Sequence, residues 1–267
     1  MATESDMFSV LIAAQRVWAV GAVHGDLDQL RTVHHELERR FLPGDRLVYL
    51  GNYLGRGPDI LAVQDEILRL RRAVLSRPGI FVGDVAFLRG AQEEMWRKLL
   101  QLHLAPNPRE VLDWMLDQGV AETLLAYGGN AADGRAACHE GAVSLARWTS
   151  TIQQAVRAHP GHDEITMALR RAAYTADSGL LFVAAGIDPH RPISQQGDTF
   201  WWGSGYFSEI EAPYDGYRRI VRGCGRSKNG PNLNSYAITL DGGCGFGGQL
   251  IAACISLDGT IVDTIKA

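Results

Sequence analysis

The sequence predicts an α/β protein in which two mixed sheets lie face to face between layers of helices, a four-layer α/β/β/α sandwich with a helical insertion. Apolar β-rich runs alternate with helical periodicity through the first third of the chain, which is typical of βαβ units with parallel strands. The final third returns to strands separated by short turns, which favours antiparallel pairing. A single domain over residues 1–267 accommodates this pattern.

The first third supports this prediction element by element. Asp26 can cap a helix because apolar residues recur at helical spacing after it, beginning with Leu27 and Leu30. Pro43-Gly44-Asp45 forms a turn before the next apolar run. The expected elements are, in order, a strand over Arg16–Val23, a helix from Asp26, a strand over Arg46–Leu50, a helix from Asp59 to about Leu75, a strand region over Ile80–Leu88 and a helix after Arg89-Gly90.

The rest of the chain divides into a helical part and a strand-rich part. Residues from about Asn107 to Ala176 are expected to form a helical insertion, with Pro108 near one helix start and a long periodic stretch over Glu140–Ala158. The last three of the strands that follow are expected to form an antiparallel meander. These strands are Leu180–Ala184, Arg219–Val221, Ser235–Leu240, Gln249–Ser256 and Thr260–Ile265.

The composition indicates a folded domain and argues against nucleic-acid and membrane partners. Hydrophobic residues make up 46% and charged residues 21% of the chain, which fits a folded domain, and the net charge of −4 argues against a nucleic-acid partner. The sequence contains no 18-residue apolar stretch, so we expect no membrane partner. The four cysteines are widely spaced and form no C-x-x-C pair, which favours free thiols in a reducing compartment, the cytoplasm.

Five glycine-flanked loops follow the predicted strands. Ligands of open α/β sheets bind at the carboxyl ends of strands, and glycine lets the backbone approach a ligand closely. Each loop taken alone is equally a simple turn, so the prediction rests on their order and spacing. The loops are Gly21–Asp26 (GAVHGD), Gly51–Pro58 (GNYLGRGP), Leu88–Glu93 (LRGAQE), Phe182–Pro189 (FVAAGIDP) and Ile220–Gly225 (IVRGCG).

In order, these loops resemble the motifs of the calcineurin-like metallophosphoesterase family, in particular its serine/threonine phosphatase and diadenosine tetraphosphatase branch. That branch carries GDxHG, GDxVDRGP, LRGNHE, FVHAG and a final GH or AH pair. The resemblance extends over roughly residues 16–265, and the glycine-rich Leu240–Leu250 is similar to the family's ending. It implies a metallophosphoesterase-like fold for this chain.

The residues that carry the family's chemistry are largely replaced. Mapped through the resemblance, five of the six metal-ligand positions are substituted, and the six are Ala22, His24, Asn52, Ala91, Ala184 and Cys224. Only His24 keeps the family residue, so His24 and Asn52 are the remnant of the metal site. The family's catalytic histidine is Gln92 here, and the aspartate that supports it is Gly55. Its phosphate-binding arginine is kept as Arg56.

These replacements bear directly on the chemistry. A two-metal centre needs anionic ligands between cations that lie about 3.5–4 Å apart and repel each other. Ala22, Asn52 and Gly55 remove three carboxylates from one pocket, and Mg²⁺ or Mn²⁺ prefers carboxylate oxygen. Losing the proton donor at Gln92 slows acid–base catalysis by roughly 10²–10⁴-fold. We therefore expect no metal cofactor, with Mn²⁺ or another divalent ion, as in the family, as the alternative.

Arginines beside the loops are the candidate phosphate-binding residues. Guanidinium groups match phosphate oxygens bidentately, and the lost carboxylates leave these arginines with fewer counter-charges. The candidates are Arg56, Arg89 and Arg222, with Arg226 as a fourth. Alternatively, they pair with Asp26, Asp59 or Glu93 and only hold the scaffold.

Cys224 admits two further hypotheses. Together with His24 it could ligate Zn²⁺, although two ligands are too few for a specific site. Arginine nearby could also lower its pKa and make it a nucleophile. The C-x₅-R pattern of cysteine phosphatases would, however, need arginine where the chain has Gly230. A buried structural thiol is the simpler interpretation.

Three other features are expected to be structural. Asp241–Gly248 follows a strand without opening a helix, so a hairpin turn is favoured over a phosphate loop. Trp201-Trp202 is expected to pack over a sheet, the alternative being an exposed partner-binding patch. The histidines away from the loops are expected at the surface or at helix ends, and they are His34, His35, His103, His139, His159, His162 and His190.

The leading functional hypothesis is a pseudophosphatase, a catalytically degenerate phosphoesterase homologue that binds a phosphate- or nucleotide-containing ligand or regulates a protein partner. The first alternative is a weak or altered phosphoesterase that hydrolyses phosphoproteins or dinucleoside polyphosphates. Its metal ligands would have to come from residues such as Asp26, Asp84 or Glu93. The second alternative is a structural partner of an active paralogue. Metal content distinguishes the enzyme from the other two.

Overall fold

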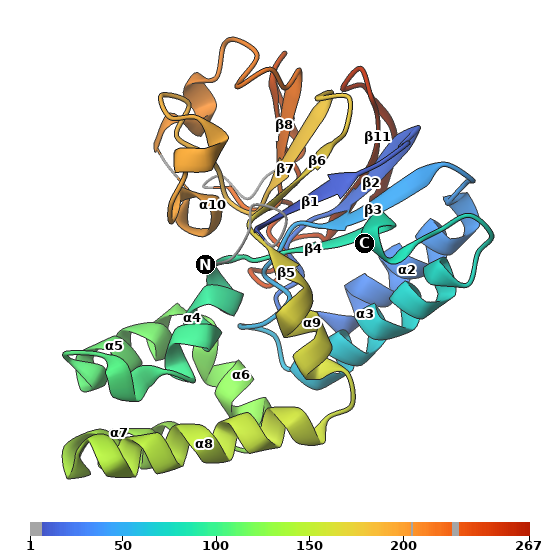
Figure 1. The fold of residues 1–267 in the computed structure, drawn as a ribbon. Coiled ribbons are helices and arrows are strands. Elements are labelled where there is room, and N and C mark those ends of the chain that lie inside the picture. The colour runs from blue at the N-terminus through green and yellow to red at the C-terminus, as the bar shows by residue number, and fades with distance from the viewer. Residues whose placement is uncertain (1–6, 204, 226–229) are drawn as a thin grey trace.

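A computed structural model describes residues 7–203, 205–225 and 230–267 (Figure 1). Within these residues, two six-stranded mixed sheets pack face to face. Apolar side chains from both inner faces fill the space between the sheets, among them Val48 and Leu50 from one sheet and Phe182 and Val221 from the other. The predicted two-sheet α/β architecture is therefore correct.

The first sheet contains the parallel strands expected from the first third of the chain. β2, β3, β4 and β5 run parallel, while β11 pairs antiparallel with both β2 and β12. Val17 to Val20 of β2 are all buried because the strand is covered on both faces. Across the sheet, the strands are β12 (Ile261–Lys266), β11 (Ile251–Ser256), β2 (Arg16–Val20), β3 (Asp45–Tyr49), β4 (Val85–Leu88) and β5 (Leu169–Arg170).

The second sheet corrects the predicted C-terminal meander. β10 pairs in parallel with β8 in this sheet, whereas β11 and β12 form a hairpin in the other one. The segment Asp241–Gly248 is therefore a crossover between sheets and not a hairpin turn. Across the sheet, the strands are β1 (Phe8–Leu11), β6 (Ala172–Thr175), β7 (Leu180–Val183), β8 (Arg219–Arg222), β10 (Ala237–Thr239) and β9 (Asn232–Leu233). The sequence pattern did not predict β1.

Helices cover the outer face of each sheet unequally. α2 (Leu27–Arg40) and α3 (Ile60–Leu75) pack their apolar stripes on the first sheet. The Asp26 carboxylate caps α2 by accepting the Gln29 N–H at 3.1 Å, as expected. The second sheet has only a thin cover, formed by α10 (Thr199–Trp202), the 3₁₀ turns η4 (Ile193–Gln195) and η5 (Gly205–Glu209), and loops.

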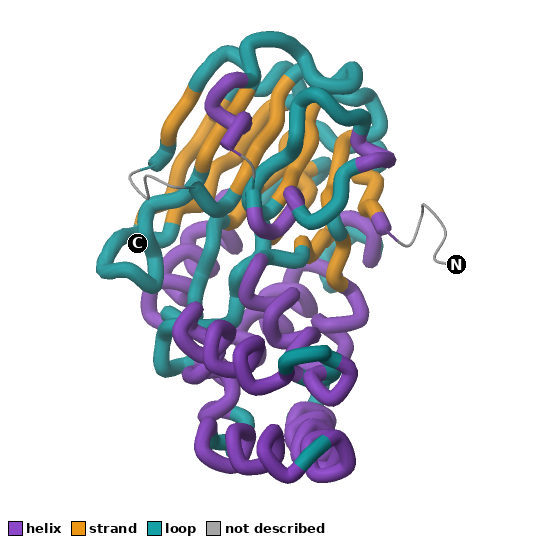
Figure 2. The backbone as a smooth tube through the Cα atoms, turned by 90° about the vertical axis from the view of Figure 1, so that its left-hand side faces the viewer, coloured by secondary structure: helices purple, strands orange, loops and turns teal. Residues whose placement is uncertain are grey.

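Most of the remaining helices gather in a lobe below the sheets (Figure 2). This lobe has its own apolar core, which includes Trp96, Met115 and Tyr127. Its helices begin before the predicted insertion, and the range 107–176 also contains β5 and β6. The lobe elements are α4 (Ala91–Leu99), η2 (Leu102–Leu104), α5 (Pro108–Met115), the π-helical η3 (Leu116–Val120), α6 (Ala121–Ala126), α7 (Ala131–Glu140) and α8 (Ala142–Ala158). Outside the lobe, η1 (Val82–Asp84) precedes β4 and lies near β1, and α9 (His162–Ala168) packs against α3 and the core of the first sheet. None of the described helices has both the length and the apolarity to cross a bilayer.

Candidate functional site at the strand ends

Backbone hydrogen bonds bring the five glycine-flanked loops together at the carboxyl ends of the strands. The His24 N–H donates to the Asn52 carbonyl at 2.8 Å, which joins the loops after β2 and β3. The Cys224 N–H donates to the Ala184 carbonyl at 2.9 Å, which joins the loops after β8 and β7. The two pairs meet where the Ala22 N–H donates to the Gly223 carbonyl at 3.4 Å. The six positions aligned with metal ligands thus surround one place in the fold.

Glu93 holds two of these loops in position. Its buried carboxylate accepts four backbone N–H groups, from Asn52, Tyr53, Leu54 and Gly90, at 2.8–3.1 Å. Burial raises the pKa of Glu93, while the four N–H groups act in the opposite direction. Because both carboxylate oxygens are used in this way, Glu93 fastens the loop after β3 to the start of α4 and is not placed to ligate a metal.

The side chains of Asn52 and Gln92 occupy the centre of the site. Asn52 has a left-handed backbone (φ 56°), and its Oδ1 accepts the Gln92 N–H at 3.1 Å. The Gln92 carboxamide lies directly against Gly55 (φ 80°), where a Cβ atom would overlap with it. An aspartate at position 55, as in the family, would therefore overlap with the Gln92 side chain where it lies in this structure.

The helical lobe closes one side of the site. The Gln92 Nε2 donates to the Gln118 carbonyl at 2.8 Å, and the Arg56 N–H donates to the Gly119 carbonyl at 3.2 Å. The Gly55 N–H donates to the Thr123 hydroxyl at 3.0 Å. All three lobe residues lie in or beside η3, where Gly119 takes φ 103°. No motif in the sequence marks these residues, because their role depends on a tertiary contact between the lobe and the loop after β3.

Phe246, from the crossover between the sheets, covers the opposite side. Its ring meets the buried His24 imidazole edge-on, with 5.4 Å between ring centroids. The centroid of the same ring lies 4.2 Å from the Arg56 guanidinium carbon, which makes a cation–π contact. Arg56 forms no ion pair within the described residues, and its buried Nε has no hydrogen-bond partner there. Arg56 is therefore a cation with donors still available beside the positions that the resemblance aligns with metal ligands.

The other candidate arginines have more partners for their guanidinium groups than Arg56 has. Arg222 donates to the Thr239 hydroxyl at 2.9 Å and to the Ala185 carbonyl at 3.2 Å, and stacks on Phe207. Arg89 lies 3.3 Å from a carboxylate oxygen of Glu94, and burial lowers its pKa. None of the predicted pairings with Asp26, Asp59 or Glu93 is present among the described residues. The prediction for Arg226 falls outside them.

The remaining acids proposed as relocated metal ligands lie elsewhere or have other partners. Asp84 precedes β4, at the opposite end of the strand from the site, and pairs with Arg46 at 2.8 Å. Our expectation that it lies near the carboxyl end of that strand was wrong. Asp26 caps α2. Throughout the described chain, no three His, Cys, Asp or Glu side chains converge as a metal centre would need. The residues present therefore do not fit a two-metal site.

The residues expected to be structural divide between core and surface. Trp201 is buried against the second sheet as predicted, while Trp202 is 39% exposed and meets Trp114 edge-on. His34 is buried in the middle of α2, contrary to expectation, whereas His162 is buried at the start of α9, one of the helix ends that were expected. His34 bonds to Glu66 and Tyr49, and His162 bonds to Tyr127 and Asp65. Each is buried with partners on other elements, which a single stretch of sequence does not reveal.

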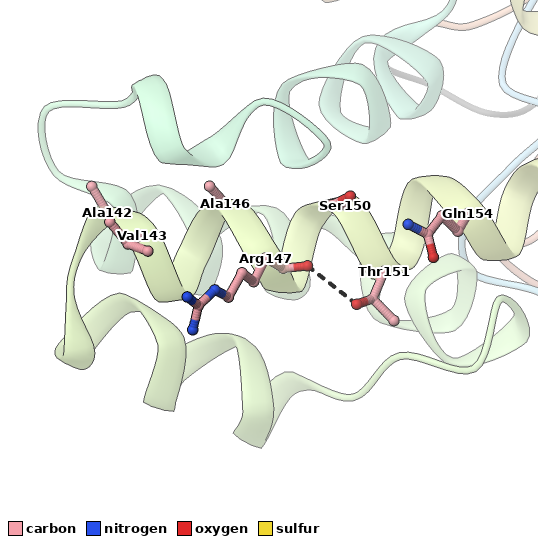
Figure 3. Close-up of a pocket in the computed structure, with 7 residues that line it drawn as sticks. All are labelled: Ala142, Val143, Ala146, Arg147, Ser150, Thr151 and Gln154. Atoms are coloured by element: carbon pink, nitrogen blue, oxygen red, sulfur yellow. Dashed lines mark hydrogen bonds between the residues drawn. The ribbon is translucent and has the colours of Figure 1, made fainter.

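A surface hollow on α8 lies apart from these loops (Figure 3). The one hydrogen bond within it runs from the Thr151 hydroxyl to the Arg147 carbonyl at 3.1 Å, within the helix itself. The hollow contains no acid, histidine or cysteine, so it offers no catalytic chemistry. Its lining residues are Ala142, Val143, Ala146, Arg147, Ser150, Thr151 and Gln154.

Comparison with known proteins places the fold. No protein-family model matches the chain, and no curated protein matches it. A crystal structure of a protein provisionally named a diadenosine tetraphosphatase is 18% identical over 97% of this chain and 98% of that one, with a TM-score of 0.55. A cold-active protein tyrosine phosphatase of a psychrophilic Shewanella species is 14% identical over 100% of this chain and 85% of that one, with a TM-score of 0.51. The chain therefore has the metallophosphoesterase-type fold that its five loops predicted.

Proposed function

We propose that this protein binds a phosphoryl group at its strand-end loops without hydrolysing it, and that it acts through this binding as a regulatory or interaction protein. The observation that carries the proposal is the pairing of Asn52 with Gln92 against Gly55, next to an Arg56 that has no acidic partner in the described chain. Five of the six positions aligned with metal ligands carry other residues, none of them a carboxylate. The phosphate-binding position keeps its charge.

Two physical points support phosphate as the ligand. Arg56 presents guanidinium donors in a region where the backbone of three loops converges, and guanidinium groups bind phosphate through charge-assisted hydrogen bonds. Stacking on Phe246 fixes the plane of the guanidinium, so less side-chain freedom is lost when an anion binds. Hydrolysis finds no comparable support, because Asp26, Asp84 and Glu93 all have structural partners.

The site of action that we propose is the cytoplasm. No disulfide joins the four cysteines, all of which lie in the described part of the chain. Burial raises the pKa of Cys244 and Cys254 to about 12, so both remain protonated near neutral pH. Four thiols without a disulfide are consistent with a reducing compartment.

The first experiment measures metal and turnover on one sample. Purified protein is incubated with excess Mn²⁺, desalted and analysed for metal, and then assayed with p-nitrophenyl phosphate. We expect no retained metal and no Mn²⁺-dependent turnover. Retention of about one or two equivalents, with turnover abolished by His24→Ala, would overturn the proposal.

The second experiment measures binding. Inorganic phosphate is titrated by calorimetry into the wild type, Arg56→Ala and Arg31→Ala, the last being an exposed arginine on α2 that serves as a matched control. Removing charge-assisted hydrogen bonds should weaken binding at this site by about tenfold or more in Arg56→Ala. Arg31→Ala should bind as the wild type does. Equal affinity of all three proteins for phosphate would remove Arg56 from the proposed site.

A further inference from the structure

Four basic side chains gather around Trp201, on the side of the molecule where α10 packs against α4 (Figure 1). We define the Trp201 cluster as Arg89, Arg97, Lys98 and Arg171 together with Trp201 and Glu94. The basic residues come from three elements. Arg89 follows β4, Arg97 and Lys98 lie at the end of α4, and Arg171 lies between β5 and β6. Because the Arg89 N–H donates to the Arg170 carbonyl at 2.8 Å, Arg89 and Arg171 lie on adjacent strand ends.

Positive charge exceeds negative charge in this cluster. Glu94 is the one carboxylate that contacts it within the described residues. Its oxygens lie 2.8 Å from Arg97, 3.3 Å from Arg89 and 3.7 Å from Lys98. Arg171 forms no ion pair or side-chain hydrogen bond in the described chain. Asp198 contributes only a longer-range attraction to Arg97. Three cations therefore share the buried Glu94 carboxylate, and Arg171 adds a fourth positive charge that no carboxylate of the described chain contacts.

The Trp201 indole brings two of these cations together. The guanidinium carbons of Arg89 and Arg171 lie 5.5 Å and 6.0 Å from the centroid of its ring. Both cations are attracted to the aromatic ring, yet they repel each other. Burial first, and then the repulsion from Arg97 and Arg171, lowers the pKa of Arg89, while Glu94 acts in the opposite direction.

Two buried donors in the cluster lack acceptors. The Trp201 Nε1 and the Arg89 Nε are inaccessible to solvent and have no hydrogen-bond partner among the described residues. Trp201 as a whole is 5% exposed. Leaving a buried donor unpaired is unfavourable, so an acceptor that satisfied both groups would stabilise the fold. The Arg89 side chain is 23% exposed and Arg97 is 43% exposed, so the cluster is open to solution on one side.

From this excess of charge and these unpaired donors we infer that the Trp201 cluster is a second anion site, which takes a phosphoryl group. A tetrahedral oxyanion supplies several acceptor oxygens for the unpaired donors and negative charge to balance the excess of cations. Within the described chain, none of the contacts of this cluster involves Arg56, which stacks on Phe246 instead. The two proposed sites can therefore be tested by separate substitutions.

The test titrates inorganic phosphate into wild type, Arg171→Ala, Arg56→Ala and Arg31→Ala at constant ionic strength, with binding measured by calorimetry and by tryptophan emission. The affinity for phosphate, measured through the change in Trp201 emission, should be about tenfold lower in Arg171→Ala than in the wild type. Arg56→Ala and Arg31→Ala should leave that emission change intact. Trp201→Phe keeps the ring but lacks the donor, and should lose the emission change and bind phosphate more weakly at this site.

Arg171 is a suitable position because its side chain has no ion pair to lose among the described residues, so Arg171→Ala should fold. Arg171→Lys keeps the charge and should bind phosphate more tightly than the alanine variant.

Phenyl phosphate serves as a second probe, since the exposed Trp114–Trp202 pair adjoins Lys98. Tighter binding of phenyl phosphate, lost in Trp202→Ala, identifies a phosphomonoester ligand. Equal affinities identify free phosphate. An emission change that is absent, or unaltered in Arg171→Ala, would overturn the inference even if the Arg56 site were intact.

Discussion

Two charged regions adjoin α4, and their charges and hydrogen-bond donors are balanced in opposite ways. Around Glu93, one carboxylate meets four backbone N–H groups, so the anion and its donors satisfy each other. In the Trp201 cluster, one carboxylate contacts three of the four cations, and two donors have no acceptor in the described chain. The comparison teaches that one carboxylate can fasten two loops through their backbone N–H groups, while charge left unbalanced nearby indicates where an external ligand would bind.

The sharpest test of this comparison removes the Glu93 carboxylate. Glu93→Ala leaves four buried N–H groups without an acceptor and should lower the free energy of unfolding by about 3–5 kcal/mol. Glu93→Gln keeps one carbonyl acceptor and should lie between the alanine variant and the wild type. Urea denaturation followed by circular dichroism measures both. A loss below about 1 kcal/mol in Glu93→Ala would mean that the loops do not depend on this carboxylate.

The next test concerns the packing of Gln92 on Gly55. Gly55→Ala introduces a Cβ atom into the space of the Gln92 carboxamide at a left-handed position, and should cost about 1–3 kcal/mol. Gln92→Ala removes the overlapping group, so the double variant should recover the steric part of the loss but not the backbone part. A double-mutant cycle from thermal unfolding separates the two. Purely additive losses would show that the carboxamide does not occupy this space.

The carboxylate of Glu66 provides a third case, in which the charge is balanced by neighbouring side chains. Burial opposes its ionisation, but hydrogen bonds from His34 and Arg69 outweigh burial and lower the pKa of Glu66 to about 2. The folded pKa is below the unfolded value near 4.5, so this contribution to stability is present above pH 4.5 and is lost as the pH falls toward 2. Melting temperatures of wild type and Glu66→Gln across this range test it. The glutamine variant should lack this part of the decline, and parallel curves would contradict the assignment.

The smallest expected effect is on stability when Glu94 is neutralised. Glu94→Gln removes the carboxylate that competes with solution anions for Arg89, Arg97 and Lys98. Its cost to stability without phosphate should be about 1 kcal/mol or less, because Arg97 and Lys98 are substantially exposed. The rise in melting temperature on adding phosphate should be larger than in the wild type. A smaller rise would mean that Glu94 supports anion binding, contrary to the charge balance described here.

The sequence was sufficient to predict the two-sheet fold and the meeting of the loops. Local patterns defined β2, β3 and the helices between them, and the order of the five loops indicated which strand ends would meet. The sheet to which β10 belongs could not be predicted, because the glycine-rich crossover Asp241–Gly248 permits either path. β1 is only four residues long and has β6 as its partner from far along the chain.

The substituted residues of the site could be predicted from the sequence, but their contacts could not. Substitution at Asn52 and Gln92 was visible in the motifs, but the contact between them was not. Gly119 reaches Arg56 from a segment that carries no recognisable motif, and the glycine-rich pattern around Phe246 did not indicate that its ring stacks on Arg56. The Trp201 cluster combines residues from β4, α4, the β5–β6 turn and α10, and no local spacing brings them together. Tertiary placement, which a single sequence does not encode as a pattern, decides each of these features.

The strand order of the first sheet has a consequence for synthesis of the protein on the ribosome. β2 is an interior strand, but one of its two neighbours is β11, so Val20 near the start of the chain pairs with Ala252 near its end. Until that late segment emerges, the apolar run Val17–Val20 presents an open edge to the surrounding solution. Open apolar edges recruit other chains. Shortened chains that end before β11 should therefore aggregate more readily than chains that contain it.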